Sequence, residues 1–598
     1  MSYRAPVKDM MFNLKHIAQI ESLCELPDLS DSSAETAQAV LEEFARFNQD
    51  AIAELNWTGD QTPSSLDPVS GVVHTSPGFK DAYAQYIEAG WQGLEHPQRF
   101  GGQGFAKSIS AACTEMLNSA NLSFALCPLL TDGAIEALRV AGSSQMQERF
   151  LPHLVSGKWS GTMNLTEPQA GSDLSLIQTR AQEAGDGHYL LFGTKIFITY
   201  GEHDMSENIV HMVLARVKDA PAGVKGISLF LVPKFKLTDN GELGERNDVH
   251  CVQLEHKLGI KASPTAVMKF GENGGAQGLL VGELNRGLEY MFVMMNAARF
   301  GVGVQGVALG ERAYQAARGY ALERIQSRAV DQPVQGPVAI VNHPDVKRML
   351  MTMRAHVQSA RALSCAAARS YDLAHHHPDE SVRLQEQRIY EFMVPLVKGY
   401  STEMSQWVSS WAVQVHGGMG FMEETGVAQY YRDAKILTIY EGTTAIQAND
   451  LLGRKTFKDR GQVAKELLAQ MKGTMDVLLG LQIPQAQSLH KRLTQAREAY
   501  EEALAFVLEH YQSEPLEVFA AGVPFLLLTA QLMAGWQMAK SMIAAKREID
   551  AAQDLEFHQG KVATAHFYAE HILTQLPGLA QSIVFGGESV NTFAPESF

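Results

Sequence analysis

A glutamate in an apolar setting is the first residue of this chain that could do chemistry. Glu441 stands between the apolar run Ile436 to Tyr440 and the glycine Gly442. A carboxylate aimed into a dry cavity has a raised pKa, which strengthens it as a general base. Gly442 lacks the side chain that would block a ligand. A helix-capping or ion-pairing glutamate is the alternative interpretation at this point.

Two earlier segments could hold a planar cofactor. MNLTEPQAGSD ends a strand in a turn whose Thr166, Ser172 and backbone N–H groups suit ring carbonyls and ring nitrogens. In GTKIFITYG, Phe197 and Thr199 are expected on one face of a strand because strand side chains alternate. Taken alone, the first segment is typical of a hairpin turn and the second of any half-buried strand.

Two other motifs predict structure and not chemistry. GVGVQG places Gly301, Gly303 and Gly306 in the pattern GxGxxG, but the motif lies within a helical run and not between a strand and a helix. We therefore expect it to allow close helix packing. His375, His376 and His377 are consecutive and cannot face one ion from a regular element, which favours a solvated loop. No metal site is predicted.

The sequence pattern that predicts secondary structure changes along the chain, from helical to β-rich and back to helical. Residues 33–158 show helical periodicity, and seven short β-rich runs between residues 159 and 284 predict an antiparallel sandwich or barrel. Long helices are expected at 290–328, 344–373 and 381–416, and the chain beyond Arg454 is again helical. This order predicts an α+β fold and excludes the alternating pattern of a doubly wound dinucleotide fold.

Net charge, cysteine content and the N-terminal sequence indicate which partners and which cellular compartment to expect. The 598 residues carry a net charge of −16, which gives no electrostatic footprint for nucleic acid. The five cysteines are far apart and odd in number, and the N-terminus is not a secretory signal, so a reducing cytoplasm is predicted. The 22 residues from Val518 to Ala539 carry no charge; a buried helix is expected there, with membrane contact as the alternative.

Taken together, several segments resemble the acyl-CoA dehydrogenase family. They are LTEPQAGSD at 165–173, KIFIT at 195–199, ALER at 321–324, QVHGGMGF at 414–421 and YEGT at 440–443. The resemblance implies an acyl-CoA dehydrogenase-like fold of an N-terminal helical domain, a middle β domain and a C-terminal four-helix bundle. The opening YRAPVKDMMF and the helical tail further resemble the extended branch that includes methylmercaptopropionyl-CoA dehydrogenases.

The predicted domains follow from this reading. They are an N-terminal extension (1–35), an N-terminal helical domain (36–158), a middle β domain (159–284), a C-terminal helical bundle (285–452) and an appended helical domain (453–598).

The resemblance also implies an FAD cofactor and a set of binding residues. Met163, Leu165, Thr166, Phe197 and Thr199 would line the isoalloxazine, and Thr443 would also meet the FAD. Arg324, together with Gln414 and Gly418 of a second protomer, would hold the pyrophosphate and adenine side, which implies a homodimer. Ser172, Asn296, Arg299 and Gly442 would face the acyl-CoA. Phe197 replaces the usual tryptophan and Ser327 the usual aromatic residue, which puts stacking at both points in question.

The implied reaction is α,β-dehydrogenation of an acyl-CoA to the trans-2-enoyl-CoA, with Glu441 taking the α proton and the flavin accepting a hydride. Electrons would leave to an electron-transfer flavoprotein. The substrate would be 3-methylmercaptopropionyl-CoA or a short- or medium-chain fatty acyl-CoA. An acyl-CoA oxidase is the nearest rival. A DNA-associated flavoprotein relative is the other, but it needs a basic C-terminal surface that a chain at −16 does not favour.

Overall fold

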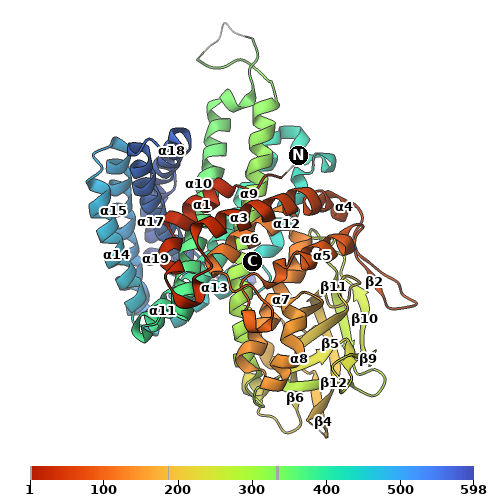
Figure 1. The fold of residues 1–598 in the computed structure, drawn as a ribbon. Helices are drawn as coiled ribbons and strands as arrows, with labels where there is room; N and C mark the ends of the chain where they lie inside the picture. The colour runs from red at the N-terminus through yellow and green to blue at the C-terminus, as the bar shows by residue number, and fades with distance from the viewer. Residues whose placement is uncertain (1–2, 186, 332–335) are drawn as a thin grey trace. The chain divides into compact units, whose positions relative to one another are not determined.

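The structure is a computed structural model that describes residues 3–185, 187–331 and 336–598 (Figure 1). It forms two units. Unit 1 contains residues 1–46, 106–119 and 299–598, and unit 2 contains residues 47–105 and 120–298. The long helix α9 (Gly287–Glu323) contributes its first part to unit 2 and the remainder to unit 1. The division into five domains remains a prediction.

Unit 2 combines short helices with a sheet (Figure 1). Its helices are α4 (Leu55–Gln61), α5 (Phe79–Glu88), α7 (Leu122–Ala141) and α8 (Ser144–Val155). The main sheet contains β3 (Trp159–Asn164), β4 (Arg180–Gly185), β5 (His188–Thr199), β6 (Asn208–Val217), β7 (Ser228–Pro233), β10 (Val249–Leu254), β11 (Thr265–Phe270) and β12 (Ala276–Val281). Two small ribbons pair β1 (Ser65–Leu66) with β2 (Val73–His74) and β8 (Phe235–Leu237) with β9 (Leu243–Arg246).

The main sheet confirms all seven expected strands and adds β4, which the sequence analysis missed. Its order is β10-β11-β5-β12-β7-β6-β3, with β4 beside β5 and β6. The pairing is mostly antiparallel, but β3 and β4 both run parallel to β6, which the prediction of an antiparallel sheet did not include. α7 packs against β3, where Gly161 allows the close approach of Ala134 and Thr131. Helix α7 therefore supports β3, the strand that carries Met163.

Unit 1 is built on long helices. They are α9, α10 (Pro344–His376) and α11 (Glu380–His416), followed by α12 (Val427–Leu437) and α13 (Thr444–Asp450). The helices α1 (Val7–His16), α2 (Ile20–Cys24), α3 (Ala34–Phe47) and α6 (Lys107–Ala120) also belong to this unit, apart from the last residue of α3 and of α6. His375 and His376 form the last turn of α10, which corrects the predicted loop.

The GVGVQG motif packs one helix against another, as predicted. A Cβ on Gly303 would lie 2.5 Å from the Val397 side chain, and one on Gly306 would lie 2.4 Å from the Ser401 carbonyl carbon. Real Cβ atoms do not approach backbone so closely, so only glycine allows this contact between α9 and α11. The helix that carries Arg299 is thereby pressed against α11.

The tail continues unit 1 with α14 (Gln462–Leu479), α15 (Pro484–His510), α16 (Pro515–Ala520), α17 (Gly522–Asp550), α18 (Leu555–His571), α19 (Leu576–Phe585) and α20 (Gly587–Asn591). α17 contains most of the uncharged stretch and is confirmed as a buried helix: it packs against α10, α11, α15, α18 and α19. One described helix, α9, is long and apolar enough to cross a membrane, but 72% of its most apolar window is buried, so this is weak support for a span.

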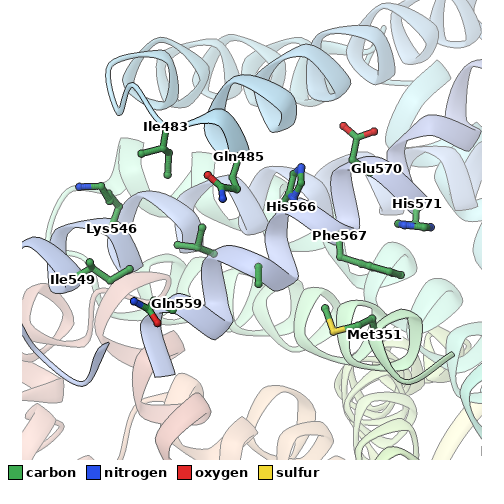
Figure 2. Close-up of a pocket in the computed structure, with 12 residues that line it drawn as sticks. Met351, Ile483, Gln485, Lys546, Ile549, Gln559, His566, Phe567, Glu570 and His571 are labelled. Carbon is green, nitrogen blue, oxygen red and sulfur yellow. The ribbon is translucent and has the colours of Figure 1, made fainter. Parts of the chain in front are cut away.

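The tail also carries a groove of about 500 Å³, shown in Figure 2. His566, Phe567 and Glu570 of α18 line it together with Gln485 near the start of α15. Glu570 is already engaged by an ion pair with Arg492, 2.9 Å away. Glu441 is not among the residues that line this groove, so the candidate active site lies elsewhere.

Candidate active site

Glu441 lies in a strained turn between α12 and α13. It has a φ of 55°, and the next residue, Gly442, has a φ of 87°. A left-handed conformation at a non-glycine residue costs on the order of 1–3 kcal/mol and persists only where its surroundings fix it. Thr443 contributes by capping α13 through a hydrogen bond from the N–H of Ile446 to its side chain. Gln447 Nε2 also donates to the carbonyl of Gly442 at 3.2 Å.

Two cations on neighbouring helices act electrostatically on the Glu441 carboxyl. Burial raises the pKa of Glu441 to about 7, and Arg299 of α9 and Lys398 of α11 oppose that rise. Lys398 Nζ donates to the Gly442 carbonyl at 2.7 Å, and Arg299 lies 3.9 Å from Asp450. A carboxyl with a pKa near neutral is suited to accept a proton as a general base.

Sequence analysis missed Lys398. The signal for it is a lysine inside the apolar run MVPLVKGY, residues 393–400. Its acceptor is a backbone carbonyl 44 residues further along the chain, which no local pattern reveals.

A short series of polar side chains holds Tyr440, the residue before Glu441. The Tyr440 hydroxyl donates to Gln305 Oε1, and Gln305 Nε2 donates to Asn118 Oδ1 at 3.0 Å. Gln305 and Asn118 are buried, so these hydrogen bonds satisfy polar groups that would otherwise destabilise the bundle. They also hold the residue that precedes Glu441.

In unit 2, hydrogen bonds bring the two predicted cofactor segments together. The N–H of Ile196 donates to the carbonyl of Thr166 at 2.9 Å, and Lys195 Nζ donates to the carbonyl of Leu165 at 2.9 Å. Lys195 Nζ also contacts Glu167 Oε1 at 2.8 Å. Burial raises the pKa of Glu167, but Lys195 and the hydrogen bonds from Thr179 and Gln178 outweigh it and lower that pKa to about 2. Leu165 and Thr166 are therefore fixed beside β5.

Phe197 lies at a β-bulge, so simple alternation does not describe its strand. The register against β11 shifts between Ala266 and Met268, and Phe197 has a φ of 60°. Two residues of β5 thus oppose one of β11, as in a bulge that re-aims a side chain. Phe197 is 58% exposed and Ile198 is buried, while Thr199 is half-buried. Phe197 and Thr199 therefore lie on either side of a buried residue, but the bulge interrupts the alternation, so the shared face expected for them remains a prediction.

The remaining predicted residues fall into two groups. In unit 2, Met163 is buried on β3, whereas Ser172, in a bend, and Asn296, on α9, are exposed. In unit 1, Arg324 follows the end of α9, Gln414 is near the end of α11, and Gly418 lies in the short helix η8 (Gly417–Phe421).

These unit 1 residues fit the cofactor that the family implies. Arg324, Gln414 and Gly418 are all exposed. Tyr320 and His416 stack at 4.3 Å, which joins the ends of α9 and α11. No protein atom lies within 4 Å of a Cβ built on Gly418, so the packing of this chain does not require glycine there, and the space is open to a ligand. Arg324 offers the planar guanidinium that suits a pyrophosphate.

The predicted site residues thus form two clusters, one within each unit. Glu441, Gly442, Thr443 and Arg299 cluster in unit 1, and Leu165, Thr166 and Phe197 cluster in unit 2. The first set offers a base, and the second offers an exposed aromatic ring beside backbone polar groups.

Comparison with known proteins gives four family matches along the chain. The acyl-CoA dehydrogenase N-terminal, middle and C-terminal domains match residues 65–158, 162–272 and 285–455. Residues 467–594 match a family described as acetyl-CoA dehydrogenase C-terminal like. A solved acyl-CoA dehydrogenase from Bacillus anthracis, complexed with FAD, has the same fold, with a TM-score of 0.72 at 21% identity, over 95% of this chain and 90% of that one.

Two relatives match over nearly their whole length. The chain is 50% identical over 592 residues to 3-methylmercaptopropionyl-CoA dehydrogenase of Ruegeria pomeroyi, covering 99% of this chain and 100% of the relative. It is 34% identical over 602 residues to a broad-specificity linear acyl-CoA dehydrogenase of Mycobacterium tuberculosis, covering 97% of each chain. The chain therefore belongs to the acyl-CoA dehydrogenase family.

Proposed function

We propose that this acyl-CoA dehydrogenase oxidises 3-methylmercaptopropionyl-CoA, with Glu441 as the base that removes the α proton. As a member of its family the protein is an FAD-dependent oxidoreductase that dehydrogenates acyl-CoA thioesters. The observation that carries the assignment of Glu441 is its placement: a buried carboxyl with a pKa of about 7, in a left-handed turn, under the electrostatic influence of Arg299 and Lys398.

The residues of this chain divide the chemistry in a simple way. Bound FAD supplies the acceptor for the β hydrogen. Glu441 takes the α proton onto its carboxylate as negative charge develops towards the thioester oxygen, and its own backbone N–H is the donor proposed for that oxygen. Gly442 leaves room for the acyl chain because it has no side chain. Ser172 is proposed to lie beside the thioester, and Asn296 and Arg299 are proposed to face the acyl-CoA.

The substrate proposal rests on the relative from Ruegeria pomeroyi, which shares half of its residues with this chain over the full length. A short- or medium-chain fatty acyl-CoA is the second candidate, which the similarity to the broad-specificity linear acyl-CoA dehydrogenase favours. One methylene in an apolar pocket changes binding by only ~1–3 kcal/mol, so substrates of similar length are expected to compete.

A panel of CoA thioesters tests the substrate. We expect 3-methylmercaptopropionyl-CoA to bleach the flavin under anaerobic conditions with a higher kcat/KM than pentanoyl-CoA, in which a methylene replaces the sulfur. A higher kcat/KM for pentanoyl- or octanoyl-CoA would favour the fatty acyl-CoA candidate. Aeration of the reduced enzyme separates a dehydrogenase from an oxidase: slow peroxide formation is expected, and rapid formation would favour the oxidase.

We further propose a homodimer in which Gln414 and Gly418 of one protomer meet the FAD of its partner. Exposed apolar side chains on η8 and beside it support this proposal: Phe421 is 86% exposed, and Met419 and Met422 are also exposed. Apolar groups of this size at one surface favour association.

An electron-transfer flavoprotein is the proposed electron acceptor. A reducing cytoplasm is the proposed compartment, and the five free cysteines agree with it.

A further inference from the structure

Lys398 is a buried lysine whose contacts do not explain its presence. It is fully buried in α11, and its Nζ donates to the neutral carbonyl of Gly442 at 2.7 Å. No ion pair within 4.0 Å is present for it among the residues that the structure describes. A buried ammonium loses several kcal/mol of hydration free energy, and one neutral acceptor does not restore it. An apolar residue would serve stability better at this position.

The backbone of α11 is tightly packed on two sides at Lys398 and Gly399. On one side, Gly303 lets α9 approach so closely that an added Cβ would lie 3.0 Å from the Lys398 backbone nitrogen. On the other side, Leu526 of the tail helix α17 packs where a Cβ on Gly399 would lie 2.6 Å away. α11 is therefore clamped between α9 and α17 at this point, and the lysine side chain is directed to the Gly442 carbonyl.

Few charged groups act on the turn that contains Glu441. Arg299 of α9 and Lys398 of α11 both interact with Glu441, and Tyr440 precedes it. Glu403 interacts with Lys398, and Asp450 and Arg454 interact with Arg299. Burial lowers the pKa of Lys398 to about 8, and Glu441 opposes that shift. The two groups thus stabilise each other's charged form.

We propose that Lys398 is a positioning residue for the base: its ammonium fixes the Gly442 carbonyl, and hence the left-handed turn, while its charge favours the ionised form of the Glu441 carboxyl. This inference rests on the assignment of Glu441 as the base. A neutral residue at position 398 would leave Arg299 as the one cation that acts directly on Glu441 within the described structure. The proton affinity of Glu441 would then rise, because a nearby positive charge favours the anion.

The test compares three variants by their pH profiles for anaerobic flavin reduction. Lys398→Met should move the acid limb of kcat/KM upward by about one pH unit, since an opposite charge at close range shifts a carboxyl pKa by roughly 1–3 units. The reduction rate at pH 7 should then fall about fivefold, because the ionised fraction of Glu441 drops from about one half to about one tenth. Lys398→Arg keeps the charge and should leave the limb near its wild-type position.

Gln447→Leu is the matched control. Gln447 Nε2 also donates to the Gly442 carbonyl, at 3.2 Å, but it carries no charge. Its loss should lower the plateau of the profile without moving the acid limb. An unmoved limb in Lys398→Met, with only the plateau lowered, would make Lys398 a structural residue and overturn the proposal.

A second readout does not depend on turnover. Infrared titration of the Glu441 carboxyl, identified by the band that Glu441→Gln removes, should give a higher pKa in Lys398→Met or Lys398→Gln than in the wild type. If neither neutral variant folds, the Lys398→Arg titration decides: a pKa far from the wild-type value would contradict the proposal. Flavin reduction that survives in Glu441→Gln would instead remove the base assignment itself, so the two failures are distinguishable.

Discussion

At the residue scale, the proposed chemistry depends on the Glu441 carboxyl, whose pKa lies near neutral pH. Burial raises the pKa of Glu441 to about 7 against the pull of Arg299 and Lys398. Below that pH the carboxyl holds a proton and cannot accept another. We therefore expect kcat/KM for flavin reduction to rise about tenfold per pH unit up to pH ~7 and then to level off. Stopped-flow reduction between pH 5.5 and 8.5, with bound FAD measured at each pH, tests this; a flat profile would contradict it.

Arg324 gives a second test at the same scale. Its guanidinium is exposed directly after α9, and its fork suits a pyrophosphate. Arg324→Ala should therefore purify as largely colourless apoprotein that regains activity with excess FAD. Arg348→Ala serves as the control, because Arg348 is also exposed and its guanidinium pairs only with Asp345 among the described residues. A full flavin complement in Arg324→Ala would show that the assignment is wrong.

At the scale of elements, glycine placement determines how closely α9 and α11 approach. Gly306→Ala would force a Cβ to 2.4 Å from the Ser401 carbonyl carbon. Overpacking of this kind costs typically ~1–3 kcal/mol, so the unfolding temperature should fall. Gly473→Ala is the matched control on α14, where nothing lies within 4 Å, and it should stabilise by about 0.5–1 kcal/mol. Calorimetry of the two variants should move in opposite directions; a shared direction would contradict the packing account.

Some of these features could be predicted from the sequence and others could not, because some depend on neighbouring residues and others on distant contacts. Glu441 and the packing glycines Gly303 and Gly306 were predictable because the meaning of each depends on neighbours in the sequence. The bulge at Phe197 was not, because a left-handed residue inside a strand is set by pairing with β11, across the sheet. Lys398 was not predicted for the same reason, since its acceptor, the Gly442 carbonyl, lies in the turn between α12 and α13.

At the scale of the whole molecule, the tail belongs to the same hydrophobic core as the helical bundle. Val397 of α11 and Phe525 of α17 lie in one buried cluster. Charged groups reinforce the connection: Asp9 of the N-terminal helix contacts Arg361 of α10 at 2.6 Å and Lys561 of α18 at 2.7 Å. The N-terminal extension, the bundle and the tail are thereby tied together within unit 1.

This arrangement predicts the assembly state. α17 packs on α10 and α11, so the tail covers this bundle surface and leaves it unavailable for further association. We expect a dimer near twice 65.6 kDa by light scattering without detergent. A tetramer would contradict the prediction, and solubility that requires detergent would support membrane contact of the tail in place of burial.

The most direct test of the central claim is anaerobic flavin reduction by 3-methylmercaptopropionyl-CoA in wild type and in Glu441→Gln. Glutamine keeps the size of the side chain but cannot accept the α proton, so the variant should retain bound yellow FAD and lose reduction by ~10²-fold or more. Glu498→Gln, an exposed change on α15 in the tail, should reduce at the wild-type rate. Bleaching of Glu441→Gln at a rate close to that of the wild type would contradict the account, because another group would then be the base.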